Sequence, residues 1–195
     1  MKILSISTDR KIFEEGSAVR QRTVEYAGLF DELHIVVFNN RFKIKDSTRP
    51  NVPIRSGRGL KVEQIGQNCW IYPTNSWSRW FYIWDAIRIG RSILSKNYEL
   101  KTSNWILDSQ DPFECGLVAM KLSRKNKLPL RVQIHTDFLN PFFVSSSFLN
   151  RIRVRIAKRV LPYATSIRVV SERIKESLLK TTNYKLKTAP LVLPI

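Results

Sequence analysis

One segment, residues 105–137, limits the possible folds more than any other, because it reads as a complete strand, helix and strand. A short apolar run beginning at Trp105 ends at polar residues, and Pro112 follows where the first turn of a helix tolerates proline. Apolar residues then recur with helical spacing as far as Pro129, and Leu130 opens a second apolar run. Such alternation is typical of parallel sheets with right-handed crossovers. The sequence predicts an α/β fold: a Rossmann-like, doubly wound, mostly parallel sheet in three layers, α/β/α.

The same alternation extends along the chain. Strands are predicted at residues 2–7, 33–38, 69–72, 104–109, 130–135 and 166–170. A first helix is predicted at 18–29, with apolar contacts from Val19, Val24, Ala27 and Leu29 and with Arg20, Arg22 and Glu25 mostly towards solvent. Residues 39–59, rich in Arg, Lys, Pro and Ser, are predicted to form a mobile loop. With 195 residues, 43% of them hydrophobic, we expect residues 1–195 to form a single domain.

The net charge is +17, from 33 Lys and Arg against 16 Asp and Glu. A surface of this charge attracts anions and indicates a partner that carries phosphate. Nucleic acid, an anionic membrane and a nucleotide sugar all fit that description. Nucleic acid is not favoured, because the sequence has no helix-turn-helix, zinc-finger or RNP-like pattern.

The basic residues are densest in segment 150–162. Ile152, Ile156 and Val160 recur every four residues, as on the apolar side of a helix, and the charged side would carry Arg151, Arg155, Lys158 and Arg159. The strict alternation at residues 151–156 would by itself favour a half-buried strand, but the following residues break it. The basic side is either a solvated surface or a site that docks on an anionic membrane.

A second unusual segment is aromatic. From residue 77 to 84 it places Trp77, Trp80 or Phe81, and Trp84 along one side of a predicted helix, next to arginines. A tryptophan stripe at helical spacing belongs more often to a core, which is the interpretation we prefer. The alternative is a membrane interface or a hydrophobic acceptor groove, because indole combines an apolar body with a polar N–H.

The two cysteines and the hydropathy of the chain carry two further predictions. Cys69 lies at a predicted strand start and Cys115 at a predicted helix start, without metal-type spacing, so both are expected to be buried free thiols. No apolar run approaches the roughly 18 residues of a membrane span. The chain begins directly with a strand rather than with a signal-peptide core. We expect a cytoplasmic protein, with peripheral attachment to the inner face of the membrane as an addition.

Candidate site residues follow the predicted strands. Because ligands of doubly wound sheets bind beyond the carboxyl ends of the strands, Gln110, Asp111 and His135 should point towards one cleft. His135 either forms a hydrogen bond to the substrate or has only a structural role, hydrogen-bonded within the protein. Asp111 is either a group that orients or deprotonates a hydroxyl or a helix cap, and Asp137 either binds substrate or supports His135.

The loop after the first strand supplies further candidates. Gly16 would let the backbone approach a ligand, and Ser17 can cap the following helix, whose N-terminus attracts phosphate. One glycine is far from a G-x-G-x-x-G motif, so a simple turn is at least as well supported. Arg20, one turn further, points either to the same cleft or to solvent.

Several of these motifs carry a family resemblance. They are QDPF, VQIHTD, the opening MKILSISTDRKIFEEGSAVRQRTVEYA, and VVSERIKESL followed by LVLPI. In their order and spacing they resemble the N-terminal, acceptor-side half of GT-B glycosyltransferases of family 4. The resemblance covers most of the chain, although residues 41–58 and 76–101 match only loosely.

The resemblance implies that the chain is half of a retaining glycosyltransferase that moves a sugar from a nucleotide-sugar donor to a glycan or lipid acceptor. It implies no metal and no cofactor other than the donor substrate. His135 would lie near the transferred sugar and the acceptor, and the Gly16 loop near the donor diphosphate; Glu15 before Gly16, in place of a second glycine, weakens that approach.

In the family, two glutamates eight residues apart lie in a C-terminal donor-binding domain, and no two glutamates here have that spacing. We therefore expect the donor-binding domain to be absent from this chain, and the chain alone to be almost inactive. The alternative is a non-catalytic, Rossmann-like module that binds nucleotides or other anions.

Overall fold

The computed structural model describes residues 1–40, 62–96, 104–181 and 186–193. The predicted mobile loop at 39–59 therefore lies, from residue 41 onwards, outside the described residues. The chain divides into two compact units, residues 1–106 and 107–195, and each is described by itself.

The first unit contains four strands in the order β3-β4-β2-β1 and the first two residues of a fifth, β5. Their bounds are β1 (Lys2–Ser7), β2 (Glu32–Val37), β3 (Glu63–Gln64), β4 (Cys69–Pro73) and β5 (Trp105–Ser109). β2 pairs in parallel with β1 and with β4, and the short β3 pairs antiparallel with β4. The helical elements of this unit are η1 (Arg10–Phe13), α1 (Ala18–Ala27), η3 (Arg79–Phe81) and α2 (Tyr82–Lys96).

One face of these strands packs on η1 and α1. The buried cluster there takes alternate residues from each strand, such as Ile3, Leu33 and Ile71, together with Ile12 and Ala27. Two side chains of the predicted apolar face of α1 are in fact exposed, because Val24 is 40% and Leu29 71% accessible to solvent. That part of the prediction is wrong: the short α1 contacts the sheet along a narrow stripe through Ala27, and Val19 is only partly buried.

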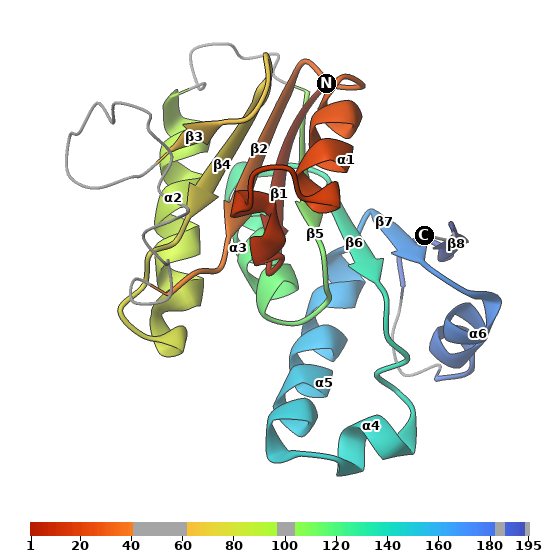
Figure 1. The fold of residues 1–195 in the computed structure, drawn as a ribbon. Coiled ribbons are helices and arrows are strands. Elements are labelled where there is room, and N and C mark those ends of the chain that lie inside the picture. Colours follow the sequence, from red (N-terminus) through yellow and green to blue (C-terminus); the bar gives the residue numbers. More distant parts are fainter. Residues whose placement is uncertain (41–61, 97–103, 182–185, 194–195) are drawn as a thin grey trace. The chain divides into compact units, whose positions relative to one another are not determined.

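The second helix of this unit, α2, contacts β2 and lies on the opposite side of the strands from α1 (Figure 1). It buries Ala86, Ile89 and Ile93, whose spacing brings them to one side of the helix. The aromatic residues at its start do not join this core, since Trp80 is 82% and Trp84 72% exposed. The core interpretation of the tryptophan stripe is therefore wrong.

The second unit continues β5 into the strand order β5-β6-β7-β8, in which each neighbouring pair is parallel. Its strands are β6 (Leu130–Ile134), β7 (Ser166–Val169) and β8 (Leu191–Val192). Its helices are α3 (Glu114–Asn126), α4 (Pro141–Ser145), α5 (Phe148–Val160), η4 (Leu161–Tyr163) and α6 (Glu172–Lys180). α3 packs on β6 and on α5.

The helical interpretation of segment 150–162 is confirmed by α5. Its N-cap is Ser147, whose hydroxyl accepts the Asn150 N–H. Its buried side agrees with the predicted one only at Val160. Val154, Ala157 and Val160 are buried, whereas Ile152 and Ile156 are half-buried on its edges. The four basic residues Arg151, Arg155, Lys158 and Arg159 are exposed, as predicted.

The predicted mostly parallel α/β fold is confirmed, and the predicted strands differ from the observed ones by at most one residue at either end. The prediction that Pro112 lies in the first turn of a helix is wrong. Pro112 lies two residues before α3, because a turn at Asp111 precedes the helix. Both cysteines are buried free thiols, as predicted. None of the helices in the described ranges has the length and apolarity that crossing a membrane requires.

Candidate functional site

Two predicted site segments meet at one edge of the second unit. Asp108 of β5 is in register with Arg131 of the parallel strand β6, so the residues after the two strands leave at the same edge. Gln110 and Asp111 follow β5, and His135 follows β6. The structure thus brings these three residues to one edge of the sheet, and a shared cleft there stays a prediction.

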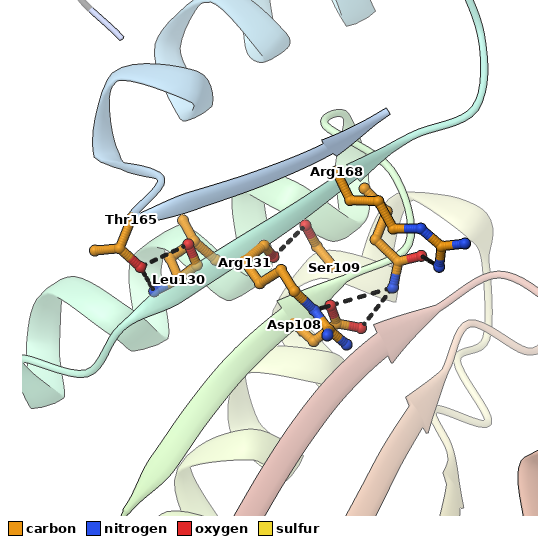
Figure 2. Close-up of polar contacts among 7 residues, drawn as sticks. Asp108, Ser109, Leu130, Arg131, Thr165 and Arg168 are labelled. Atoms are coloured by element: carbon orange, nitrogen blue, oxygen red, sulfur yellow. Dashed lines mark hydrogen bonds and ion pairs between the residues drawn. The ribbon is translucent and has the colours of Figure 1, made fainter. Parts of the chain in front are cut away.

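A network of polar side chains that the sequence did not predict lies next to this edge (Figure 2). Asp108 is 3% exposed, and its Oδ1 accepts a hydrogen bond from Arg131 Nε at 2.6 Å. Gln133 donates from Nε2 to Asp108 Oδ2 at 3.0 Å. Arg168 of β7 donates to Gln133 Oε1 at 3.4 Å and to the Leu193 carbonyl at 3.3 Å. We call Asp108, Arg131, Gln133 and Arg168 the strand network.

The strand network follows from alternation along β6. Leu130, Val132 and Ile134 are buried, while Arg131 and Gln133 between them are half-buried on the other face. A buried carboxylate needs such partners, because an unpaired buried charge costs several kcal/mol, here about 3–5 if a partner is removed. The alternating letters of β6 could have indicated one polar face; the burial of Asp108 inside an apolar strand had no signal in the sequence.

His135 is exposed at the end of β6 and is influenced by charges from the strand network. Although the residue is exposed, partial burial of the imidazole ring lowers its pKa below the usual 6.5; the Arg168 guanidinium lowers it further, while Asp111 and Asp108 oppose the shift. The neutral ring is therefore favoured near pH 7. A neutral imidazole can accept a hydrogen bond from a sugar hydroxyl as well as donate one.

Asp111 has a structural contact in addition to its place in the site. Its Oδ1 accepts the Phe113 N–H at 2.7 Å, which forms the turn that leads into α3. Burial raises the pKa of the carboxyl group, against the hydrogen bonds from the Phe113 backbone and from Cys115. A carboxyl group with a raised pKa is a better proton acceptor when ionised. The helix-cap alternative is wrong, because the N-cap of α3 is Phe113 and has no side-chain hydrogen bond; Asp111 instead closes the turn before the helix.

Asp137 and Gln110 complete the predicted set in this unit. Asp137 Oδ1 accepts a hydrogen bond from Ser177 Oγ of α6 at 2.9 Å, so this residue fixes the segment after β6 to α6. Gln110 is half-buried directly after β5.

The first unit holds the remaining predicted residues, in the turn between η1 and α1. Gly16 has φ +76°, a left-handed conformation that favours glycine, and a Cβ placed there would meet no atom within 4 Å. Ser17 caps α1 as predicted, because its Oγ accepts the Arg20 N–H at 3.2 Å. The N-terminus of α1 thus begins at an open turn.

Arg20 occupies neither of the environments that the sequence suggested. Its Nη2 forms an ion pair with Glu63 Oε1 of β3 at 2.6 Å, and the two side chains are only 19% and 9% exposed. Its Nη1 is buried without a hydrogen-bond partner among the described residues.

The first unit also contains a hollow that sequence reasoning missed. It measures about 490 Å³ and is lined by Arg10, Asn40, Trp77, Ser78, Arg79, Trp80 and Tyr82. These residues follow β1, β2 and β4, so the hollow lies at the carboxyl edge of the strands. Across the described ranges, no three His, Cys, Asp or Glu side chains are grouped so that they could hold a metal ion.

No protein-family model and no curated protein matches this chain. Its fold does resemble solved structures. A UDP-GlcNAc 2-epimerase from Methanocaldococcus jannaschii matches with TM-score 0.55 and 15% identity, over 98% of this chain and 45% of that one. A putative UDP-N-acetylglucosamine 2-epimerase from Listeria monocytogenes gives TM-score 0.54, 13% identity and coverages of 98% and 44%. A third, from Rickettsia bellii, gives TM-score 0.53, 10% identity and coverages of 93% and 42%.

At these identities the likeness shows the fold alone. It supports the expected α/β, Rossmann-like fold, whereas membership of family 4 is not shown. The chain spans less than half the length of the structures that it resembles.

Proposed function

We propose that this chain is the N-terminal half of a retaining glycosyltransferase that transfers a sugar from a nucleotide-sugar donor to a glycan or lipid acceptor. Two things support the proposal. The fold is that of one part of enzymes named for a nucleotide sugar, UDP-GlcNAc. The motifs at the carboxyl ends of β5 and β6 resemble those of family 4 glycosyltransferases.

The observation that carries the proposal is the position of His135 and Asp111 at one edge of the sheet, next to the strand network. His135, kept neutral by burial and by Arg168, would hydrogen-bond to the transferred sugar or to the acceptor. Asp111 would orient or deprotonate the acceptor hydroxyl, helped by its raised pKa. Gln110 and Asp137 would contribute hydrogen bonds at the same edge.

In the first unit, the turn at Gly16 and Ser17 would receive the donor diphosphate. Backbone N–H groups at the start of α1 attract phosphate oxygens, and Gly16 leaves room for them. Arg20 would act indirectly, because its ion pair with Glu63 holds α1 against β3. No residue here is required to bind a metal, and the donor is a substrate rather than a cofactor.

Most cationic groups that stabilise the departing diphosphate would belong to a C-terminal donor-binding domain, our main proposed partner of this chain. An anionic membrane is a further proposed partner, through Arg151, Arg155, Lys158 and Arg159 of α5, which are exposed. We place the protein in the cytoplasm, at the inner face of the membrane.

The alternative function is a non-catalytic module that binds nucleotides or other anions. It is supported by the same fold and by the net charge of +17. Titration with nucleotides and with glycans separates the two functions. A glycosyltransferase half should recognise a glycan or lipid acceptor, whereas the module should bind nucleotide and ignore acceptors.

The coding sequence beyond Ile195 and the neighbouring reading frames provide the first test. We expect a second α/β domain with two glutamates eight residues apart. The assembled protein should transfer a radiolabelled sugar, and both His135→Ala and Asp111→Asn should lower kcat by about a hundredfold, the usual effect of removing one acid–base group. Thr136→Ala, an exposed neighbour in the same segment, is the matched control. Full transfer activity in both site variants would contradict these roles.

A further inference from the structure

Four neighbouring aromatic side chains of the first unit are exposed: Trp77 71%, Trp80 82%, Phe81 48% and Trp84 72%. Three exposed arginines lie on the same segment, Arg79, Arg88 and Arg91. We call these seven residues the aromatic–arginine surface. Large aromatic side chains each bring roughly 150–250 Å² of mostly apolar area, so at these exposures the four present about 400–700 Å², as much as the largest apolar patch of a typical monomer.

The local structure keeps these rings away from the core. Ser78 caps η3 by accepting the Trp80 N–H, and α2 then buries Ala86, Ile89 and Ile93 against the sheet. The rings of the aromatic–arginine surface stay exposed, because none of them belongs to this buried side. Their exposure therefore comes from well-formed secondary structure and not from an unpacked end of the chain.

Positive charge lines the hollow beside the rings. Arg10 Nε donates to the Phe38 carbonyl at 3.0 Å and Arg10 Nη2 to the Tyr82 hydroxyl at 3.1 Å. Tyr82 in turn stacks on Phe38, which fixes this wall of the hollow. Arg79, Trp77 and Trp80 also line the hollow.

The segment contains one carboxylate, Asp85, whose charge is offset. Its Oδ2 accepts a hydrogen bond from Ser76, and its Oδ1 lies 3.5 Å from Arg88 Nη2. The electrostatic character of the aromatic–arginine surface is thus cationic, in keeping with the charge of the whole chain.

We propose that the aromatic–arginine surface docks on an anionic lipid bilayer. Tryptophan and arginine suit the membrane interface, where indole rings bury their apolar body among headgroups and guanidinium groups contact lipid phosphates. The hollow between Arg10 and Arg79 receives one lipid phosphate. A glycan platform accounts less well for the surface, because Phe81 and Trp84 do not line the hollow and are still 48% and 72% exposed.

This docking is independent of sugar transfer, since it needs neither a donor nor an acceptor. It also differs from the α5 proposal, because it uses apolar rings and residues of the first unit. The two can be separated by variants of each surface.

Flotation of the purified chain with vesicles tests the proposal. Phosphatidylcholine vesicles that contain phosphatidylglycerol should bind the chain, and pure phosphatidylcholine vesicles should bind it much less. The double variant Trp77→Ala/Trp80→Ala should lose about tenfold or more in affinity, because each buried indole contributes more than 1 kcal/mol. Arg79→Gln should lose less, in proportion to one charge. The matched controls are Arg22→Gln, at an exposed position of α1, and Leu29→Ala, at an exposed position of the turn after α1.

A second measurement does not depend on variants. Lipids brominated near the headgroup should quench much of the tryptophan fluorescence of the wild-type chain. The proposal would be overturned by unquenched fluorescence or by unchanged binding of the double variant. It would also be overturned if binding were lost only on Gln substitution at Arg151, Arg155, Lys158 and Arg159. Complete displacement of the chain from vesicles by inorganic phosphate would also overturn it, by showing a free-anion site.

Discussion

At the scale of single residues, Arg20 and Glu63 form the most buried ion pair between helix and strand in the first unit, among the residues described. Replacing Arg20 by Met would leave the Glu63 carboxylate buried and uncompensated, which typically costs about 3 kcal/mol or more. We expect that loss in urea unfolding followed by circular dichroism. Adding Glu63→Gln should recover part of it, and Arg22→Met, at an exposed position, should change stability by less than about 0.5 kcal/mol. An Arg20→Met protein as stable as wild type would refute a buried pair.

His135 gives a second prediction at this scale. Because burial and then Arg168 lower its pKa, the imidazole should titrate below the usual 6.5 in a two-dimensional NMR titration. Arg168→Gln should move the midpoint upwards, whereas Arg173→Gln, at an exposed position of α6, should not. If Arg168→Gln left the titration midpoint of His135 unchanged, the charge of Arg168 would not influence the imidazole.

The sign of the stability effect follows from the same shifts. Burial lowers the pKa of His34 as well as that of His135. Between the lower folded pKa and the unfolded value near 6.5, the unfolded chain binds more protons. The free energy of unfolding should therefore fall as the pH drops through about 6.5, and this contribution should level off below the folded pKa.

How far single residues are predictable depends on whether the signal is local. The turn glycine, the Ser17 cap and the buried cysteines follow from short stretches of sequence and are confirmed. The partner of Arg20 was not predictable, because Glu63 lies 43 positions further along the chain and meets it only through the sheet. Asp108 was missed for the same reason, since its partners Arg131 and Gln133 come from the next strand.

At the scale of elements, α3 and α5 approach closely at Gly116. A Cβ placed there would lie 3.0 Å from the Asp111 carbonyl oxygen and 3.1 Å from Val160 Cγ1. In an open helix Gly→Ala stabilises by roughly 1 kcal/mol, but crowding against backbone should outweigh that gain. Gly116→Ala should lower the melting temperature, and Lys121→Ala, exposed on the same helix, should leave it nearly unchanged. A more stable Gly116→Ala protein would contradict the close packing.

Helices and strands were predictable wherever apolar and polar residues follow a regular pattern along the sequence. The alternation of apolar and polar runs located each long strand to within a residue at either end. The sides of the helices were less predictable. The stripe of α5 runs through Val154, Ala157 and Val160, because the smaller Ala157 permits closer packing than Ile152 or Ile156 would. The rings of residues 77–84 stay outside because the buried side of α2 begins only at Ala86.

At the scale of the whole molecule, the chain matches less than half the length of the structures that it resembles, and it contains no pair of glutamates eight residues apart. We expect the purified chain to bind ligands but to transfer almost no sugar. The measurement is release of nucleotide from radiolabelled nucleotide sugars in the presence of acceptors. Rapid turnover by residues 1–195 alone would refute the assignment of the donor-binding groups to a second domain.

The central claim, that the strand ends of this fold bind a nucleotide sugar, is tested most directly by amide chemical-shift mapping. The ¹⁵N-labelled chain would be titrated with UDP-GlcNAc, the sugar nucleotide named for the matching structures. The account predicts shift changes at Gln110, Asp111 and His135, which lie at one edge of the second unit. No change at saturating ligand, or changes confined to other surfaces, would contradict it.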